Sequence, residues 1–243
     1  MIALLRLRHL AFVEPMGKRE RLGSAYGGWI CDTSRLQSDD LAICAGAGED
    51  ITFDVELNAR FGLRVVCVDP TPRSIAHVEA VVASSELDHA VAIDSGPRHY
   101  DMRGFARDRF FFVPKALWNS EGSIRLYEPT DPEHVSHSAL NLQGTTSYID
   151  VSATTIDVLV GCYAKSSGLA LLKLDIEGAE YVVLDRLITS RCRPDQILVE
   201  FDELYRPRSL AAFRRVGTRI RALRKSGYFL SAVDNANFTF LRR

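Results

Sequence analysis

Short apolar runs and longer amphipathic stretches alternate along most of the chain. The runs at 41–48 and 64–70 are rich in aliphatic residues and typical of buried strands. The stretches 50–62 and 72–85, which follow them, have the apolar spacing of helices. Further strands are predicted at 109–118, 122–129, 147–153, 169–177 and 196–203, and further helices at 154–168, 178–191 and 208–227. This alternation predicts a parallel sheet with helices on both faces.

The two ends of the chain depart from this alternation. Residues 228–243 contain two apolar runs joined by Asn-Ala-Asn, which predicts a hairpin that adds an antiparallel edge to the sheet. Residues 1–40 begin with an apolar run that Arg6 and Arg8 interrupt, and continue as a polar segment with a Gly-Gly turn. We therefore expect an N-terminal extension, 1–40, packed on a core domain, 41–243, and neither a signal peptide nor a membrane span.

The composition is that of a globular protein. Hydrophobic residues make up 47% of the chain and charged residues 25%, which excludes a disordered or fibrous protein. The net charge of −1 provides no general attraction for nucleic acid or an anionic membrane, so we expect neither as a partner. The five cysteines are widely spaced and form no C-x-x-C pair, which indicates reduced thiols and a cytoplasmic protein.

A glycine-rich turn follows the first core strand. Gly46, Ala47 and Gly48 permit a tight turn and close approach of the backbone to a ligand. Glu49 and Asp50 place negative charge at the start of the next helix, where a pyrophosphate would be repelled. The ammonium and sulfonium groups of S-adenosylmethionine suit this position better. The alternative, that Asp50 only caps the helix, stays open.

A further carboxylate comes at the end of the next strand. Asp69 follows Gly48 by about 20 residues and directly precedes Pro70. In nucleoside-binding α/β folds, an acidic residue at this spacing accepts hydrogen bonds from ribose hydroxyls. Asp69 is therefore the expected ribose ligand.

Charged residues also interrupt the apolar run at 169–177. Lys173, Asp175 and Glu177 alternate with apolar residues, and the two carboxylates come at the strand end, where open parallel sheets bind ligands. Lys173 lies deeper and needs a counter-charge, for which both Asp175 and Glu177 are candidates. Glu180 falls in the first turn of the following helix, where negative charge is favourable.

The stretch from Leu171 to Leu184, LLKLDIEGAEYVVL, resembles the hallmark of the FkbM family of S-adenosylmethionine-dependent methyltransferases. GAGEDITFDVEL and VVCVDPTPRSI are similar to the cofactor loop and ribose strand of that family, and VPKALWNSEGSIRLYEP to its third strand. The resemblance extends over residues 26 to 240. It implies the class I methyltransferase fold, an α/β Rossmann-like architecture with a mostly parallel seven-stranded sheet and an antiparallel C-terminal edge.

The resemblance also implies how the cofactor would lie. Residues 46–50 would hold the methionine end of S-adenosylmethionine. Asp69, with the adjacent Pro70, would hold the ribose. Ala116 and Leu117, at the end of the third strand, would lie near the adenine.

Methyl transfer to a hydroxyl requires a base within hydrogen-bond reach of the acceptor. The candidates are Asp175, Glu177 and His137, which belongs to a segment that also resembles a feature of the family. Lys173 would hold the carboxylates in place, and Asp202 stands where the resemblance implies a histidine. No metal-ligand spacing is recognisable, so no metal is predicted.

The sequence therefore predicts an S-adenosylmethionine-dependent O-methyltransferase that acts on a hydroxyl of a sugar or natural product. Its partner would be a small-molecule or glycan acceptor, and a homo-oligomer stays possible. Three alternatives are an N-methyltransferase, a non-catalytic S-adenosylmethionine-binding module and a nucleotide-linked oxidoreductase. Glu49 and Asp50 disfavour the last.

Overall fold

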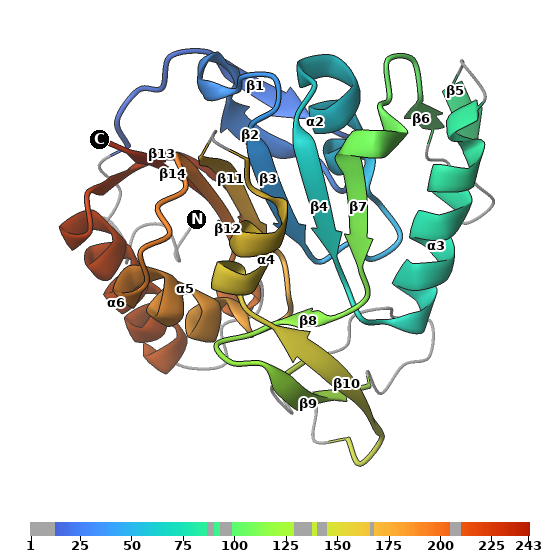
Figure 1. Ribbon diagram of the computed structural model, residues 1–243. Coiled ribbons are helices and arrows are strands. Elements are labelled where there is room, and N and C mark those ends of the chain that lie inside the picture. The colour runs from blue at the N-terminus through green and yellow to red at the C-terminus, as the bar shows by residue number, and fades with distance from the viewer. Residues whose placement is uncertain are drawn as a thin grey trace.

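A seven-stranded sheet forms the centre of the computed structural model (Figure 1). The structure describes residues 13–86, 90–92, 99–128, 138–139, 145–165, 168–204 and 210–243. From one edge of the sheet to the other, the strands are β13 (Tyr228–Asp234), β14 (Asn237–Arg242), β12 (Gln196–Glu200), β11 (Leu169–Leu174), β3 (Leu41–Ala45), β4 (Arg64–Val68) and β7 (Phe110–Val113). This arrangement confirms the predicted fold class.

The predicted C-terminal hairpin consists of β13 and β14. Strand β14 runs antiparallel to both of its neighbours, β12 and β13, so β13 runs in the same direction as the rest of the sheet. The antiparallel strand therefore lies one position inside the edge. A short turn forces this order, since two consecutive strands joined by Asn235 and Ala236 must pair with each other.

Helices cover both faces of the sheet, as the alternation of strands and helices predicted. Leu172 and Leu174 of β11 point to a core that α4 (Ile156–Tyr163), α5 (Glu180–Thr189) and α6 (Leu210–Lys225) complete. Leu171, which comes directly before Leu172, belongs to the opposite core, with α2 (Thr52–Phe61) and α3 (Pro72–Ala83). Strand β11 is buried throughout because both of its faces meet helices. Single turns of 3₁₀-helix also occur, at η1 (Thr33–Arg35), η2 (Ser84–Glu86), η3 (Arg107–Arg109) and η4 (Asp202–Leu204).

The strand predicted at 109–118 is two strands in two different sheets. Its first half is β7, at the edge of the central sheet, and its second half is β8 (Ala116–Leu117). Pro114 separates them because it lacks the N–H that a continuing ladder requires. Strand β8 pairs with β10 (Tyr148–Thr154), which pairs with β9 (Gly122–Tyr127). This small sheet lies below the arrowheads of β3, β4 and β7 in Figure 1, so it faces their carboxyl ends.

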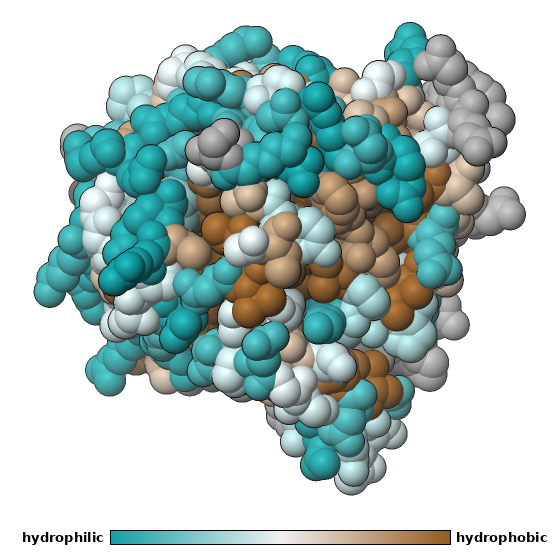
Figure 2. Space-filling model, viewed as in Figure 1, coloured by the Kyte–Doolittle hydropathy of each residue, from teal (hydrophilic) through white to brown (hydrophobic). Residues whose placement is uncertain are grey.

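The edge strand β7 contributes to an apolar surface. Apolar residues gather near the middle of the face seen in Figure 2, and polar residues surround them. Phe111 of β7 packs against Tyr163 of α4 with 5.0 Å between ring centroids, and the guanidinium of Arg64 lies 5.1 Å from the same Phe111 ring. The cation and the second ring cover part of this edge. A two-stranded sheet of β5 (Ala90–Ala92) and β6 (His99–Asp101) occupies a stretch that the sequence pattern left without a predicted element.

Residues 13–40 contain a second hairpin, β1 (Arg19–Leu22) and β2 (Trp29–Asp32), which packs beside α2 (Figure 1). The side chain of Gln196 accepts from the Asp32 N–H at 2.8 Å and donates to the Asp32 carbonyl at 3.0 Å. Leu22, Trp29 and Cys31 lie in the same core as α2 and α3. The described part of the N-terminal segment is thus fixed to the sheet. The division of the chain at residue 40 stays a prediction.

Among the residues that the structure describes, no helix combines the length and apolar character required to cross a membrane.

Candidate functional site

A pocket of about 650 Å³ opens where the order of the strands reverses, between β3 and β11. Open α/β sheets bind ligands at this position because the connections of neighbouring strands leave in opposite directions. The lining includes twelve of the thirteen residues singled out from the sequence: Gly46, Ala47, Gly48, Glu49, Asp50, Asp69, Pro70, Ala116, Leu117, Lys173, Asp175 and Glu177. The thirteenth, His137, lies outside the described residues.

The glycine loop after β3 is shaped by its contact with β11. Gly46 has a φ of +87°, and a Cβ at this position would lie 1.7 Å from the Asp175 carbonyl oxygen. Only glycine fits there, since a side chain would meet both steric overlap and an unfavourable backbone conformation. The absent side chain lets the glycine loop pack directly against the end of β11, and this contact fixes where the loop backbone lines the pocket.

Asp69 binds the glycine loop itself. One carboxylate oxygen accepts from the N–H groups of Ala47 and Gly48 at 3.0 and 3.2 Å. The other accepts from the N–H and hydroxyl of Thr71 at 2.8 and 2.7 Å. These four bonds use most of the acceptor capacity of a carboxylate. A ribose at Asp69, which stays a prediction, would have to share or replace one of them.

The two acidic residues at the start of α2 have different partners. Glu49 forms a bidentate pair with Arg73, at 3.0 Å for both bonds. Asp50 accepts from the Thr52 N–H at 3.0 Å, and from the Ser24 hydroxyl of the N-terminal segment at 2.6 Å. The N-cap position of α2 is Ile51, so Asp50 contacts the helix start from one residue earlier and is not its N-cap, and it also lines the pocket.

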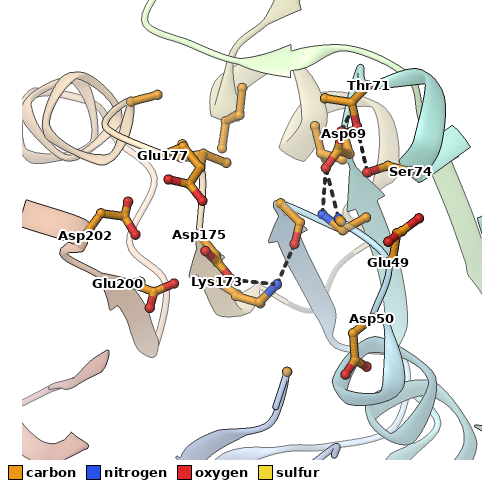
Figure 3. A pocket seen from close by; sticks show the side chains of 18 of the residues that line it. Glu49, Asp50, Asp69, Thr71, Ser74, Lys173, Asp175, Glu177, Glu200 and Asp202 are labelled. Carbon is orange, nitrogen blue, oxygen red and sulfur yellow. Dashed lines mark hydrogen bonds and ion pairs between the residues drawn. The ribbon is translucent and has the colours of Figure 1, made fainter. Parts of the chain in front are cut away.

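Lys173 lies between the two sides of the pocket (Figure 3). Its side chain is 3% exposed, and its ammonium donates to the Gly46 carbonyl at 2.6 Å. The Asp175 carboxylate is 3.9 Å away, so Asp175 is a counter-charge of this lysine. Burial lowers the pKa of Lys173, but the charges of Asp175 and Asp54 outweigh it and the net direction is upward. Lys173 is therefore a charged tie between the strand end and the glycine loop.

The corner after β11 places Glu177 toward the pocket. Glu177 has a φ of +51°, in the left-handed region that residues other than glycine seldom adopt, and Gly178 follows with a φ of +96°. The Glu180 carboxylate accepts from the N–H groups of Ile176 and Gly178, both at 2.8 Å. Ser138 of the preceding segment donates its hydroxyl to the Glu177 carbonyl at 2.6 Å. These three bonds hold an uncommon backbone conformation at a functional site.

Two carboxylates that sequence reasoning did not assign to the site come from the neighbouring strand. Glu200 ends β12 and Asp202 follows it, and both line the pocket beside Asp175 and Glu177 (Figure 3). Burial raises the pKa of Asp202, and the charges of Glu180, Glu177 and Asp175 raise it further. One oxygen of Asp202 has no hydrogen-bond partner in the described part of the chain. Their position at a strand's carboxyl end was the available signal.

The N-terminal hairpin also contributes to the lining, which the sequence did not indicate. Arg21, Tyr26 and Trp29 line the pocket, and the Arg21 guanidinium pairs with Asp234 at 2.6 Å. Trp29 lies with its ring centroid 5.8 Å from the Lys173 ammonium. Among the described residues, no group of three or more His, Cys, Asp or Glu side chains is arranged to hold a metal ion.

The lining fits S-adenosylmethionine in its chemistry. A bare glycine backbone and the carboxylates at the start of α2 lie on one side of the pocket, and more carboxylates lie on the other. A ligand with a sulfonium and an ammonium group matches this negative lining.

Solved structures share a general likeness with the chain at low sequence identity. A methyltransferase FkbM from Methylobacillus flagellatus is 12% identical with a TM-score of 0.47, over 84% of this chain and 43% of its own. A precorrin-6y C5,15-methyltransferase from Geobacter metallireducens is 11% identical with a TM-score of 0.42, over 86% and 85%. Fibrillarin from Aeropyrum pernix, in complex with S-adenosyl-L-methionine, is 9% identical with a TM-score of 0.42, over 95% and 85%.

The chain thus spans less than half the length of the Methylobacillus protein. No curated protein matches it. The methyltransferase FkbM domain model, however, matches residues 41–229, which contain the glycine loop, the β11 corner and the β12 carboxylates. The chain therefore belongs to the FkbM family of S-adenosylmethionine-dependent methyltransferases.

Proposed function

We propose that this protein transfers a methyl group to a hydroxyl of a sugar or natural-product acceptor. The observation that supports the proposal is the pair of carboxylates, Asp175 and Glu177, that face the same pocket as the glycine loop (Figure 3). S-adenosylmethionine, when bound, supplies a methyl group activated on a sulfonium. The work left to the chain is to orient the acceptor and remove its proton.

Carboxylates at the ends of β11 and β12 are suited to that work. A carboxylate within hydrogen-bond reach orients an acceptor hydroxyl and takes up its proton as the oxygen becomes bonded to carbon. The Asp175 side chain is 30% exposed and lines the pocket, and its carboxylate lies 3.9 Å from the Lys173 ammonium. We assign the base to Asp175 or Glu177. His137 remains a third candidate on sequence grounds.

A specific feature favours amine acceptors as a second candidate. Asp175, Glu177, Glu200 and Asp202 lie together on the acceptor side, and the Lys173 ammonium is directed toward Gly46. Such a lining attracts a cationic amine, which would give a proton to a carboxylate before its nitrogen accepts the methyl group. A sugar and its amino-sugar analogue, offered as competing acceptors, separate the two reactions by the atom that becomes methylated.

Cofactor binding is tested first. Isothermal titration with S-adenosylhomocysteine should give a saturable heat, and NAD should give none. Binding of NAD without S-adenosylhomocysteine would contradict the proposal and favour the oxidoreductase alternative.

The catalytic assignment is tested with Asp175→Asn. The substitution keeps the shape of the side chain but removes its basicity, so kcat should fall by roughly 10²- to 10⁴-fold. The Kd of S-adenosylhomocysteine, which Asp175 affects only through Lys173, should rise by no more than about tenfold. Asp185→Asn is the control, because Asp185 pairs with Arg219 on the surface of α5 and should leave kcat unchanged. Unchanged turnover in Asp175→Asn would remove Asp175 from the catalytic residues. A chain that binds the cofactor but methylates no acceptor would be a binding module.

We further propose a cytoplasmic protein whose partners are small molecules or glycans. All five cysteines, Cys31, Cys44, Cys67, Cys162 and Cys192, are free thiols. This state is typical of reducing compartments.

A further inference from the structure

A buried carboxylate that the proposed chemistry does not use lies in α2. Asp54 is in the first turn of this helix, where an acidic side chain ordinarily faces solvent and interacts with the helix dipole. Here it is 1% exposed, and neither of its oxygens has a hydrogen-bond partner among the described residues. Burial of an unpaired carboxylate is costly, so its surroundings must offset the cost.

The surroundings of Asp54 are set by the register of three neighbouring strands. In the register of the sheet, Lys173 of β11 lies opposite Cys44 of β3, and Cys44 lies opposite Cys67 of β4. These side chains form a row across the sheet face that α2 covers, since Cys44 and Cys67 share a core cluster with Phe53 of that helix. Asp54 thus lies close enough to the two thiols and the Lys173 ammonium for them to lower its pKa, although none of them forms a hydrogen bond of normal geometry with it.

Lys173 connects Asp54 with the pocket. The charges of Asp175 and Asp54 raise the pKa of its ammonium group, which donates to the Gly46 carbonyl at 2.6 Å. The lysine is 2% exposed, so little water is available to stabilise its charge. Its charged state, and therefore the strength of its bond to the glycine loop, depends on both carboxylates.

We propose that Asp54 is a positioning residue, which acts through Lys173 to hold the glycine loop and Asp175 in the geometry that binds the cofactor. The inference depends on family membership and not on the identity of the acceptor. The alternative is a purely structural role in the packing of α2.

The two roles differ in their pH dependence. Burial raises the pKa of Asp54 to about 6, against the lowering effects of Lys173 and the two thiols. Besides Lys173, the titratable groups that act on Asp54 in the described part of the chain are Cys44 and Cys67, whose pKa values burial raises so that they stay neutral. As the pH falls through about 6, Asp54 becomes neutral and loses its hold on Lys173. Affinity for S-adenosylhomocysteine should then fall with it.

The test compares Asp54→Asn with Asn58→Ala by isothermal titration from pH 5 to pH 8. Asn58 lies in the same helix, is fully buried, and bonds to Leu63 and Ala106 away from the pocket. At pH 7.5, Asp54→Asn should weaken S-adenosylhomocysteine binding on the order of tenfold and make the affinity less dependent on pH. Asn58→Ala should lower the Tm but keep both the wild-type affinity and its pH dependence.

Two results would overturn the proposal. One is a folded Asp54→Asn protein with wild-type affinity and pH dependence. The other is a wild-type affinity that does not change between pH 5 and pH 7, which is decisive even when the variant fails to fold.

A double variant with Lys173→Met adds a third measurement. Because Asp54 acts through Lys173, the double variant should bind no more weakly than Lys173→Met alone, whereas additive losses would show that the two residues act independently.

Discussion

At the residue scale, the site depends on backbone conformations that few side chains tolerate. Gly46 and Glu177 both adopt positive φ values, on the two loops that meet at Lys173. The glycine loop approaches the Asp175 carbonyl so closely that the absence of a Cβ is a requirement. The residue-scale design is therefore a close contact between two strand ends, tied by one buried ammonium.

Gly46→Ala and Gly48→Ala form a matched pair that tests this contact. Both glycines have positive φ, but a Cβ at Gly48 would meet nothing within 4 Å, whereas one at Gly46 overlaps the Asp175 carbonyl. Gly48→Ala should cost about 1 kcal/mol of backbone strain and keep the fold, with a smaller loss of cofactor binding than Gly46→Ala. Gly46→Ala should lose S-adenosylhomocysteine binding by at least 100-fold or fail to fold. Equal effects in titration and thermal unfolding would show that backbone conformation alone matters.

At the element scale, parallel strands bring together residues that are distant in the sequence. The carboxyl ends of β11 and β12 are adjacent, so Asp175 and Glu177 meet Glu200 and Asp202. The corner after β11 holds them because the Glu180 carboxylate accepts two backbone N–H groups. The concentration of negative charge in the pocket therefore results from the adjacent carboxyl ends of β11 and β12.

The crowding of carboxylates predicts how stability responds to pH. Burial and the neighbouring carboxylates hold the folded-state pKa of Asp202 above the ordinary value of an aspartate, so ionisation of this group destabilises the fold. Its favourable contribution is complete below the unfolded pKa and is lost as the pH rises toward the folded-state pKa. Asp202→Asn cannot ionise, and its Tm should match the wild type most closely near pH 4 and exceed it by several degrees near pH 9.

Thermal unfolding from pH 4 to pH 9 shows whether the Tm of Asp202→Asn rises relative to the wild type as the pH increases. Asp185→Asn is again the control, since Asp185 is an exposed partner of Arg219 and should show no growing advantage with pH. A Tm gain for Asp202→Asn that is constant with pH would mean that packing, and not charge, explains the difference.

At the scale of the whole molecule, the N-terminal segment and the sheet share one core. Trp29 and Leu22 pack with residues of α2 and α3, and Gln196 of β12 bonds to both backbone groups of Asp32. The segment also supplies Arg21 and Tyr26 to the pocket. A segment with this much shared burial should fold together with the domain.

The two tryptophans allow that expectation to be measured. Trp29 lies in the N-terminal hairpin and Trp118 follows β8, so Trp29→Phe and Trp118→Phe each leave one fluorescent probe. The two variants should show urea transitions whose shapes coincide with those from circular dichroism. An earlier transition reported by Trp29 would show that the N-terminal segment unfolds first and behaves as a separate unit.

Local chemistry made several parts of this protein predictable. The alternation of apolar and amphipathic stretches, the bare glycines after one strand and the carboxylates after another all depend on neighbours in the chain. Twelve of the thirteen site residues selected in this way line one pocket. The single strand predicted at 109–118 was wrong. Apolar residues on both sides of Pro114 concealed the point where the chain leaves the central sheet.

The sequence alone determined the family, the fold class and the strand ends that carry chemistry, because these depend on residue type and short-range spacing. Only the tertiary structure decided which charges meet. It directed Lys173 to the Gly46 carbonyl, brought Asp54 close enough to act on the charge of Lys173, and added Glu200 and Asp202 beside Asp175. The register between strands, which brings together residues far apart in the chain, is fixed by the packing of whole faces and leaves no local mark in the sequence.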